Sequence, residues 1–83
     1  MEIEFSKHAL DQMVRRDIST EMVLSLVHQP DSIFDQDETI RIYTKLVDED
    51  SRIYLYRVFV NYLKNPSIII TAYKTSKIEK YGY

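Results

Sequence analysis

The stretch Arg52–Leu63, which reads RIYLYRVFVNYL, decides the fold. It is rich in aromatic and β-branched residues and contains neither glycine nor proline, so it predicts a long β-strand. Side chains alternate between the two faces of a strand, which separates this stretch into two rows. One row holds Ile53, Leu55, Arg57 and Phe59, and the other holds Tyr54, Tyr56, Val58 and Val60.

Two further strands are expected beside this one. Residues 39–47 alternate between apolar and polar side chains, and the acidic residues 48–51 that follow are expected to form a hairpin turn. After the turn Asn65-Pro66-Ser67, residues 67–74 form another strand. The expected short edge strands, if they form, are residues 32–36 and Met1–Phe5. The pattern predicts an antiparallel sheet of three or four strands.

Residues 6–29 carry a helical period instead. Ser6 suits the N-cap of a first helix, Ser19 or Thr20 suits the N-cap of a second, and Pro30 ends the second helix. Each helix has one apolar stripe. The stripes consist of Ala9, Leu10, Met13 and Val14, and of Met22, Val23, Leu26 and Val27. We therefore predict one α+β domain over residues 1–83, with an N-terminal helical hairpin packed on one face of the sheet.

Composition restricts the class of protein. The 83 residues include no cysteine, so disulfides and thiolate metal sites are not expected, and a reducing cytoplasm is the expected location. Acidic residues at Glu2 and Glu4 do not fit a signal peptide. The apolar run Ile68–Ile70 is far shorter than the roughly 20 residues that span a membrane. No metal-ligand spacing, phosphate-binding glycine loop or nucleophile–histidine–acid pattern occurs, so we expect no metal or cofactor.

Charge is segregated along the chain. Residues 1–30 carry three Lys/Arg against five Asp/Glu, and residues 31–50 carry two against seven. Residues 52–83 carry six against one, although the whole chain has a formal net charge of −2. The basic C-terminal part could bind a phosphate group. The overall acidity of the chain argues against tight non-specific binding to nucleic acid.

Arg57 is the most informative single residue. It lies in the middle of an apolar row, where a guanidinium must be paired or must face an opening. One interpretation pairs it with an acidic residue from 35–38 on a neighbouring strand. The other places it in an anion-binding groove, and the sequence leaves both interpretations open.

The first helix carries His8, Arg15 and Arg16. His8 and Arg15 are seven residues apart and therefore lie on nearly the same side. They could face one phosphate. Alternatively, they belong to a solvated face on which Asp11 and Arg15 form a surface pair worth about 0.3–0.5 kcal/mol.

Tyrosines and lysines near the strands also allow two interpretations. Seven tyrosines are many for this length, and tyrosines on sheets cover cores or stack on unpaired bases. Tyr73 and Lys74 stand at a strand end. Lys74, Lys77 and Lys80 repeat every three residues and would line one side of a helix, or belong to a solvated tail.

The motif Ser6-Lys7-His8-Ala9, the residues Arg16-Asp17-Ile18-Ser19, Pro30 and the closing Ile69-Ile70-Thr71-Ala72-Tyr73-Lys74 carry a resemblance. Together they resemble domain-of-unknown-function family 4258, which is similar in plan to the RelE/ParE-type toxins and especially to the BrnT-like ribonuclease toxins.

That resemblance implies a microbial RNase fold and the toxin of a toxin–antitoxin pair, held silent by a cognate antitoxin protein. Such toxins cut RNA without a metal: a base takes the 2′-hydroxyl proton, cations stabilise the phosphate, and an acid protonates the leaving 5′-oxygen. The catalytic residues that it implies are His8, Arg16, Arg57, Tyr73 and Lys74. The RNA-binding residues are Arg15, Tyr54, Tyr56, Lys77 and Lys80. Lysines replace the arginine-rich end of BrnT-like toxins, and a lysine lacks the fork by which arginine grips phosphate.

Two other functions remain open from the sequence. The chain could be a non-catalytic module of the same fold that docks a protein partner through the acidic segment 31–50 or a sheet edge. It could also be a homodimer that pairs its edge strands. Neither alternative requires RNA.

Overall fold

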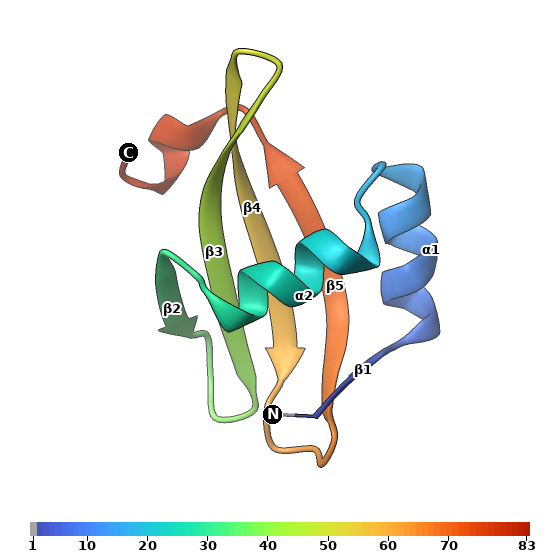
Figure 1. Cartoon of the computed structure of the whole chain (residues 1–83). Helices are drawn as coiled ribbons and strands as arrows, with labels where there is room; N and C mark the ends of the chain where they lie inside the picture. The colour runs from blue at the N-terminus through green and yellow to red at the C-terminus, as the bar shows by residue number, and fades with distance from the viewer. Residues whose placement is uncertain (1) are drawn as a thin grey trace.

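A computed structural model describes residues 2–83 and confirms the α+β class, with two α-helices and one mixed sheet (Figure 1). Both helices and all three long strands lie where the periodicity placed them, within two residues at each end. The elements in chain order are β1 (Ile3–Phe5), α1 (Lys7–Arg15), α2 (Thr20–His28), β2 (Ser32–Asp35), β3 (Ile40–Glu49), β4 (Arg52–Asn61), β5 (Ser67–Thr75) and the 3-10 helix η1 (Ile78–Tyr81).

The sheet corrects the prediction of three or four antiparallel strands. It has five strands in the order β1-β5-β4-β3-β2, and β1 pairs with β5 in parallel, with Ile3 opposite Ser67. All other pairs are antiparallel. The two edge strands have three and four residues, too few for a reliable alternation in the sequence. Nothing local in β1 encodes its direction relative to a strand more than sixty residues away.

The helices cover one face of this sheet (Figure 1). Each begins at a serine, because the Ser6 and Ser19 hydroxyls accept hydrogen bonds from the backbone N–H groups of Ala9 and Met22, both at 3.0 Å. Their apolar stripes pack on alternate residues of β4 and β5. The core formed in this way contains Ala9, Met13, Ile18, Val23, Leu26, Val27, Tyr43, Tyr56, Val58, Val60, Ile69 and Ala72.

Neither α-helix of the described residues covers the other face, which we call the open face. Strand register places Thr44, Arg57 and Tyr73 side by side on it. Thr44 and Leu55 are nevertheless only 1% exposed there, and the C-terminal tyrosines Tyr81 and Tyr83 line a pocket above them. The chain therefore turns back after β5 and partly shields the open face.

The hairpin between β3 and β4 is a tight two-residue turn. Glu49 pairs with Arg52, and the residues between them, Asp50 and Ser51, have φ values of 52° and 68°. Two-residue hairpin loops with two such residues match the right-handed twist of the strands. The turn predicted over residues 48–51 is thus shorter than expected, since β3 continues to Glu49.

Neither helix in the described part of the chain combines the length and the apolar character needed to cross a membrane.

Candidate functional site

Arg57 lies half-buried in the centre of the open face. Its Nη1 donates a hydrogen bond of 2.6 Å to the hydroxyl of Tyr73 on β5. The guanidinium carbon is 5.5 Å from the ring centre of Phe59, 5.7 Å from that of Tyr73 and 4.6 Å from that of Tyr81. Three electron-rich rings thus surround one cation, an arrangement that favours the charged side chain in a partly dry environment.

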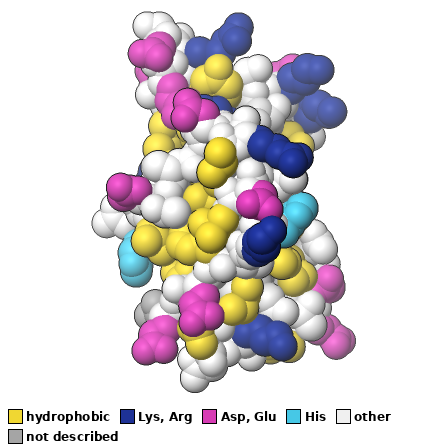
Figure 2. Space-filling view, turned by 90° about the vertical axis from the view of Figure 1, so that its right-hand side faces the viewer, with side chains coloured by type: hydrophobic (Ala, Val, Ile, Leu, Met, Phe, Trp, Pro, Cys, Tyr) yellow, Lys and Arg dark blue, Asp and Glu magenta, His cyan; other side chains and the backbone are white. Residues whose placement is uncertain are grey.

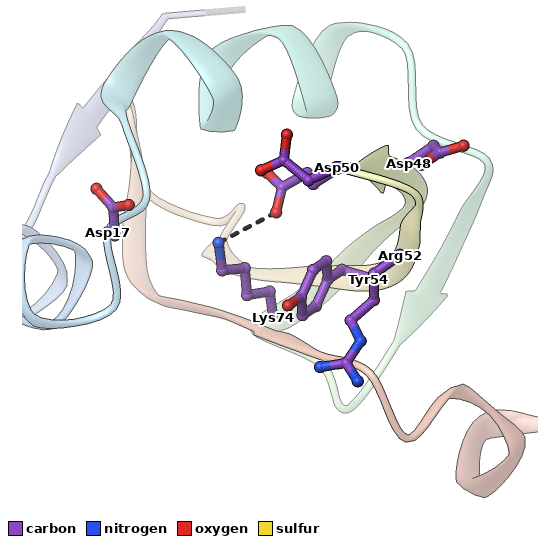
Figure 3. A pocket seen from close by; sticks show the side chains of 7 residues that line it. Asp17, Asp48, Asp50, Arg52, Tyr54 and Lys74 are labelled. Carbon is purple, nitrogen blue, oxygen red and sulfur yellow. Dashed lines mark hydrogen bonds and ion pairs between the residues drawn. The ribbon is translucent and has the colours of Figure 1, made fainter.

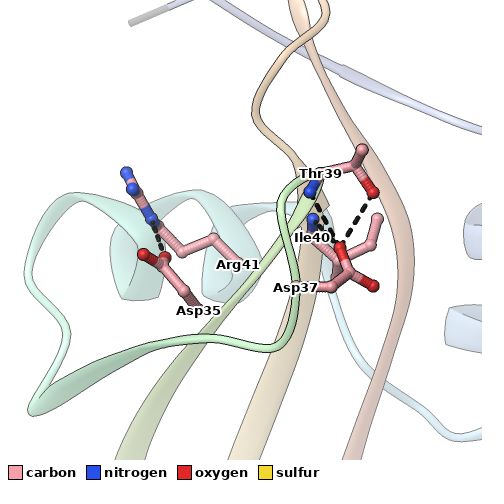
Figure 4. A network of polar contacts seen from close by, with 5 residues as sticks. All are labelled: Asp35, Asp37, Thr39, Ile40 and Arg41. Carbon is pink, nitrogen blue, oxygen red and sulfur yellow. Dashed lines mark hydrogen bonds and ion pairs between the residues drawn. The ribbon is translucent and has the colours of Figure 1, made fainter.

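Among residues 2–83, no carboxylate lies within ion-pair distance of this cation. Within residues 2–83, the three ion pairs closer than 4.0 Å involve Lys7, Arg41 and Lys74, and none involves Arg57. Two of the expected partners are occupied elsewhere (Figure 4). Asp35 accepts a 2.7 Å hydrogen bond from Arg41, and Asp37 accepts from the backbone N–H groups of its own turn. The interpretation that pairs Arg57 with residues 35–38 is therefore wrong.

The remaining N–H groups of Arg57 lie near the Tyr81 ring and are not sealed from solvent. Its hydrogen bond to Tyr73 is the one that the described residues provide, and none of their buried side-chain nitrogen or oxygen atoms lacks a partner. The unused donors are consequently not enclosed. An arginine with free donors can bind a planar or tetrahedral anion in a forked geometry.

Tyr73 and Tyr81 form a hydroxyl pair beside Arg57, with 3.1 Å between their oxygens. Burial is the main cause that raises the pKa of Tyr73, and its hydrogen bond with Tyr81 adds to this. That same hydrogen bond is the main cause that lowers the pKa of Tyr81, and the positive charge of Arg57 contributes. The two phenols therefore differ in acidity, and Tyr81 is the easier one to deprotonate.

Arg16 reaches the same region from the end of α1. Strand β1 pairs with β5 only as far as Ile69, which leaves later carbonyl groups at this edge without a strand partner. Arg16 Nη1 donates to the carbonyl oxygen of Ala72 at 2.8 Å, and its guanidinium carbon lies 6.0 Å from the ring centre of Tyr73. Arg16, Arg57, Tyr73 and Tyr81 are hereafter the open-face cluster.

His8 and Arg15 do not join this cluster. His8 and Arg16 are eight residues apart along α1, which corresponds to about 12 Å along the helix axis. Both His8 and Arg15 are exposed. Asp11 pairs with Lys7 at 3.8 Å rather than with Arg15, so this face of α1 carries an ordinary surface pair.

Lys74 lies on the opposite side of the sheet from Arg57 because it follows Tyr73 directly in a strand. Its ammonium nitrogen is 3.2 Å from Glu49 Oε1, and the Tyr56 hydroxyl donates a short hydrogen bond to the other carboxylate oxygen. The hydrogen bond from Tyr56, followed by the contact with Lys74, holds the pKa of Glu49 below its usual value. Burial and then the bond to Glu49 raise the pKa of Tyr56 to about 12.

A hollow of about 730 Å³ lies at this second cluster. Figure 3 shows Lys74 inside it, between Asp17 from the turn after α1 and Asp50 from the hairpin. Tyr54 also lines it, with its ring centre 5.1 Å from the Lys74 nitrogen. Tyr56 is 2% exposed, so its ring offers no face to a base. Four of the seven residues that line this hollow are acidic: Asp17, Asp48, Glu49 and Asp50.

Acidic and basic side chains gather on different parts of the surface near this hollow. Figure 2 views the molecule from the right-hand side of Figure 1, so the helix-covered face lies on the left of the view. Acidic side chains gather at the upper left and basic ones at the upper right. The separation is partial, because Arg52 and Lys74 line the helix-side hollow together with four acidic residues.

Lys77 and Lys80 are exposed near the C-terminus. Lys77 precedes η1 and Lys80 lies within it, whereas Lys74 belongs to β5. The three lysines therefore do not line one side of a helix. Among the residues described, no group of three or more His, Asp or Glu side chains could hold a metal ion.

Residues 5–74 match the model of the family described as Domain of unknown function (DUF4258). The chain belongs to this family. The match includes Arg16, Arg57 and Tyr73, and it ends before η1, so Tyr81 lies outside it. No curated protein and no solved structure matched the chain.

The sequence signal for Tyr81 was weak. It is one of seven tyrosines and lies in a segment with the character of a solvated tail. Its place beside Arg57 depends on the reversal of the chain after β5, which no local pattern indicates.

Proposed function

We propose that this chain is the toxin of a toxin–antitoxin pair, similar to the RelE/ParE-type and BrnT-like toxins, and that it binds and cleaves RNA on the open face without a metal. The observation that carries the proposal is Arg57, a central cation to which the described residues supply no carboxylate partner. A phosphodiester supplies the missing anion.

The open-face cluster provides the groups that this reaction needs. Arg57 binds the scissile phosphate, and Arg16 contributes positive charge from the edge of β5. Tyr81 in its phenolate form takes the proton from the 2′-hydroxyl, the 2′-oxygen attacks phosphorus, and the bond from phosphorus to the 5′-oxygen breaks. Tyr73 gives its proton to the leaving 5′-oxygen, so the products are a 2′,3′-cyclic phosphate and a 5′-hydroxyl end.

The opposite pKa shifts of the two phenols support this division of roles. A raised pKa keeps Tyr73 protonated and able to donate, whereas a lowered pKa makes Tyr81 the better acceptor. The proposal adds Tyr81 to the sequence-based catalytic site and omits two of its residues. Lys74 faces the other side of the sheet, and His8 lies about two helical turns from Arg16.

Growth of a bacterial host during induction of the chain alone tests this function. We expect growth arrest together with new 5′-hydroxyl RNA ends, and we expect Arg57→Gln to remove both effects. Co-expression of the cognate antitoxin is expected to restore growth. Normal growth with intact RNA would contradict the proposal.

One observation favours a second candidate, the non-catalytic protein-binding module. Ile33 and Phe34 on the edge strand β2 are 51% and 52% exposed. An exposed apolar edge strand can pair with another chain, either a partner protein or a second copy. If this module is the function, the chain is harmless on induction and Ile33→Lys abolishes partner binding or dimer formation.

A further inference from the structure

A pocket of about 140 Å³ lies on the open face, lined in part by Arg57 and Tyr81, and the functional proposal above assigns no ligand to it. Its volume is well below the roughly 300–1,000 Å³ of pockets for drug-sized ligands, so it suits a single ring system. The residues that line it are Phe34, Thr44, Leu55, Arg57, Tyr81 and Tyr83.

The walls of this pocket are aromatic and accessible. Phe34 is 52% exposed, Tyr81 is 36% exposed and Tyr83 is 47% exposed. Folding normally hides large aromatic side chains, and their concentration around one opening marks a binding site more strongly than scattered exposure does. They come from segments far apart in the sequence, since Phe34 belongs to β2 and the tyrosines to the C-terminal segment.

The floor of the pocket is fixed and mostly apolar. Thr44 and Leu55 are each 1% exposed and lie in the paired strands β3 and β4. The Thr44 hydroxyl already donates a hydrogen bond of 3.4 Å to the carbonyl oxygen of Ser32. The floor therefore offers no free hydrogen-bond donor to a ligand. A ligand held here would be recognised by its flat faces rather than by its edges.

Arg57 supplies the remaining wall and connects this pocket to the phosphate site. A nucleotide carries a flat base next to an anionic phosphate. The aromatic walls of the pocket match the base, and the Arg57 guanidinium matches the phosphate. Unpaired bases stack on tyrosine and phenylalanine rings and on guanidinium planes in proteins that bind single-stranded RNA.

We propose that this pocket binds one unstacked nucleobase of a single-stranded RNA, adjacent to the phosphate that Arg57 holds. This inference rests on the proposed RNA function and specifies its substrate as single-stranded. Stacking on aromatic side chains tolerates every base, and the pocket has few polar groups, so discrimination between bases is weak.

Equilibrium binding of an uncleavable RNA tests this pocket. The probe is a labelled 2′-O-methyl hexamer, compared with hexamers that carry one abasic site at each position in turn. The variant of interest is Phe34→Ala combined with Tyr83→Ala. Its matched control is Ile33→Ala, because Ile33 is 51% exposed on the same strand and points to the opposite face of the sheet. Far-ultraviolet circular dichroism verifies that each variant is folded.

We expect the wild type and Ile33→Ala to bind the intact hexamer at least fivefold more tightly than one of the abasic hexamers, since a stacked base contributes about 1–3 kcal/mol. The aromatic double variant should bind all hexamers alike. Arg57→Gln should weaken binding to every hexamer.

Two results separate failure of the pocket from failure of the RNA function. If the double variant keeps the preference for the intact hexamer, or the wild type never shows it while Arg57→Gln still weakens binding, the pocket assignment is overturned and the RNA function stands. If the wild type binds no hexamer, both are overturned.

Discussion

Tyr56, Glu49 and Lys74 form a hydrogen-bonded group beneath the helices, and its energetics depend on pH. The Tyr56 hydroxyl donates to a charged carboxylate, which also receives the Lys74 ammonium. Such bonds are stronger than bonds between neutral groups. The pKa of Tyr56 is about 12 in the folded chain, above its ordinary value of 10.0.

We predict that Tyr56→Phe lowers the free energy of unfolding by about 1–2 kcal/mol at pH 7. Because the folded pKa is raised, the contribution of Tyr56 is complete below pH 10 and is lost as pH rises towards about 12. Urea unfolding of both proteins at pH 7 and pH 11 checks this expectation. A difference that stays constant over this range would contradict it.

Single residues also show where sequence reasoning reaches its limit. The alternation within Arg52–Leu63 placed Arg57 on the same face as Leu55 and Phe59, and strand register agrees. The same alternation separates Tyr73 from Lys74, which the resemblance had grouped in one site. Periodicity therefore assigns faces reliably, but which face the helices cover depends on packing between distant segments.

Among the elements, the β3–β4 hairpin is the most direct target. Asp50 and Ser51 both occupy the left-handed region, where L-residues other than asparagine and aspartate are strained. Asn-Gly is the pair that this turn prefers.

We predict that Asp50→Asn combined with Ser51→Gly raises the free energy of unfolding by about 0.5–1 kcal/mol, because relief of strain exceeds the greater freedom that glycine gives the unfolded chain. The urea midpoint at neutral pH measures this effect. The control is Ser76→Gly, since Ser76 lies outside the helices and strands and is exposed. A midpoint at or below that of the wild type would show that the turn is not strained.

The long elements could be predicted from the sequence because each has its own period and its own end signals. Ser6, Ser19 and Pro30 marked the ends of the helices, and the structure uses both serines as caps. The short edge strands could not be placed with the same certainty. Their pairing partners lie far away or across a loop, and three or four residues carry too little pattern.

At the scale of the whole molecule, the fold places a mostly acidic hollow on the helix side of the sheet and Arg57 on the open face. The acidic hairpin and the turn after α1 line the hollow on the helix side. On the open face, Arg57 donates a hydrogen bond to Tyr73, and Arg16 donates one to the carbonyl oxygen of Ala72 at the edge of β5. A single small domain can in this way offer a surface for an anion despite a net charge of −2. Composition alone indicated only the linear segregation of charge.

The most direct test of the open-face site is cleavage of RNA by the purified protein in buffer with excess EDTA, with 5′-hydroxyl ends mapped. Arg57→Gln is compared with Lys74→Gln, which removes a cation from the same sheet but from the opposite face. We predict that the wild type and Lys74→Gln cleave RNA, and that Arg57→Gln is slower by at least about 100-fold, as for loss of an electrostatic transition-state contact. Cleavage that survives Arg57→Gln but disappears in Lys74→Gln, or intact RNA with the wild type, would contradict the assignment.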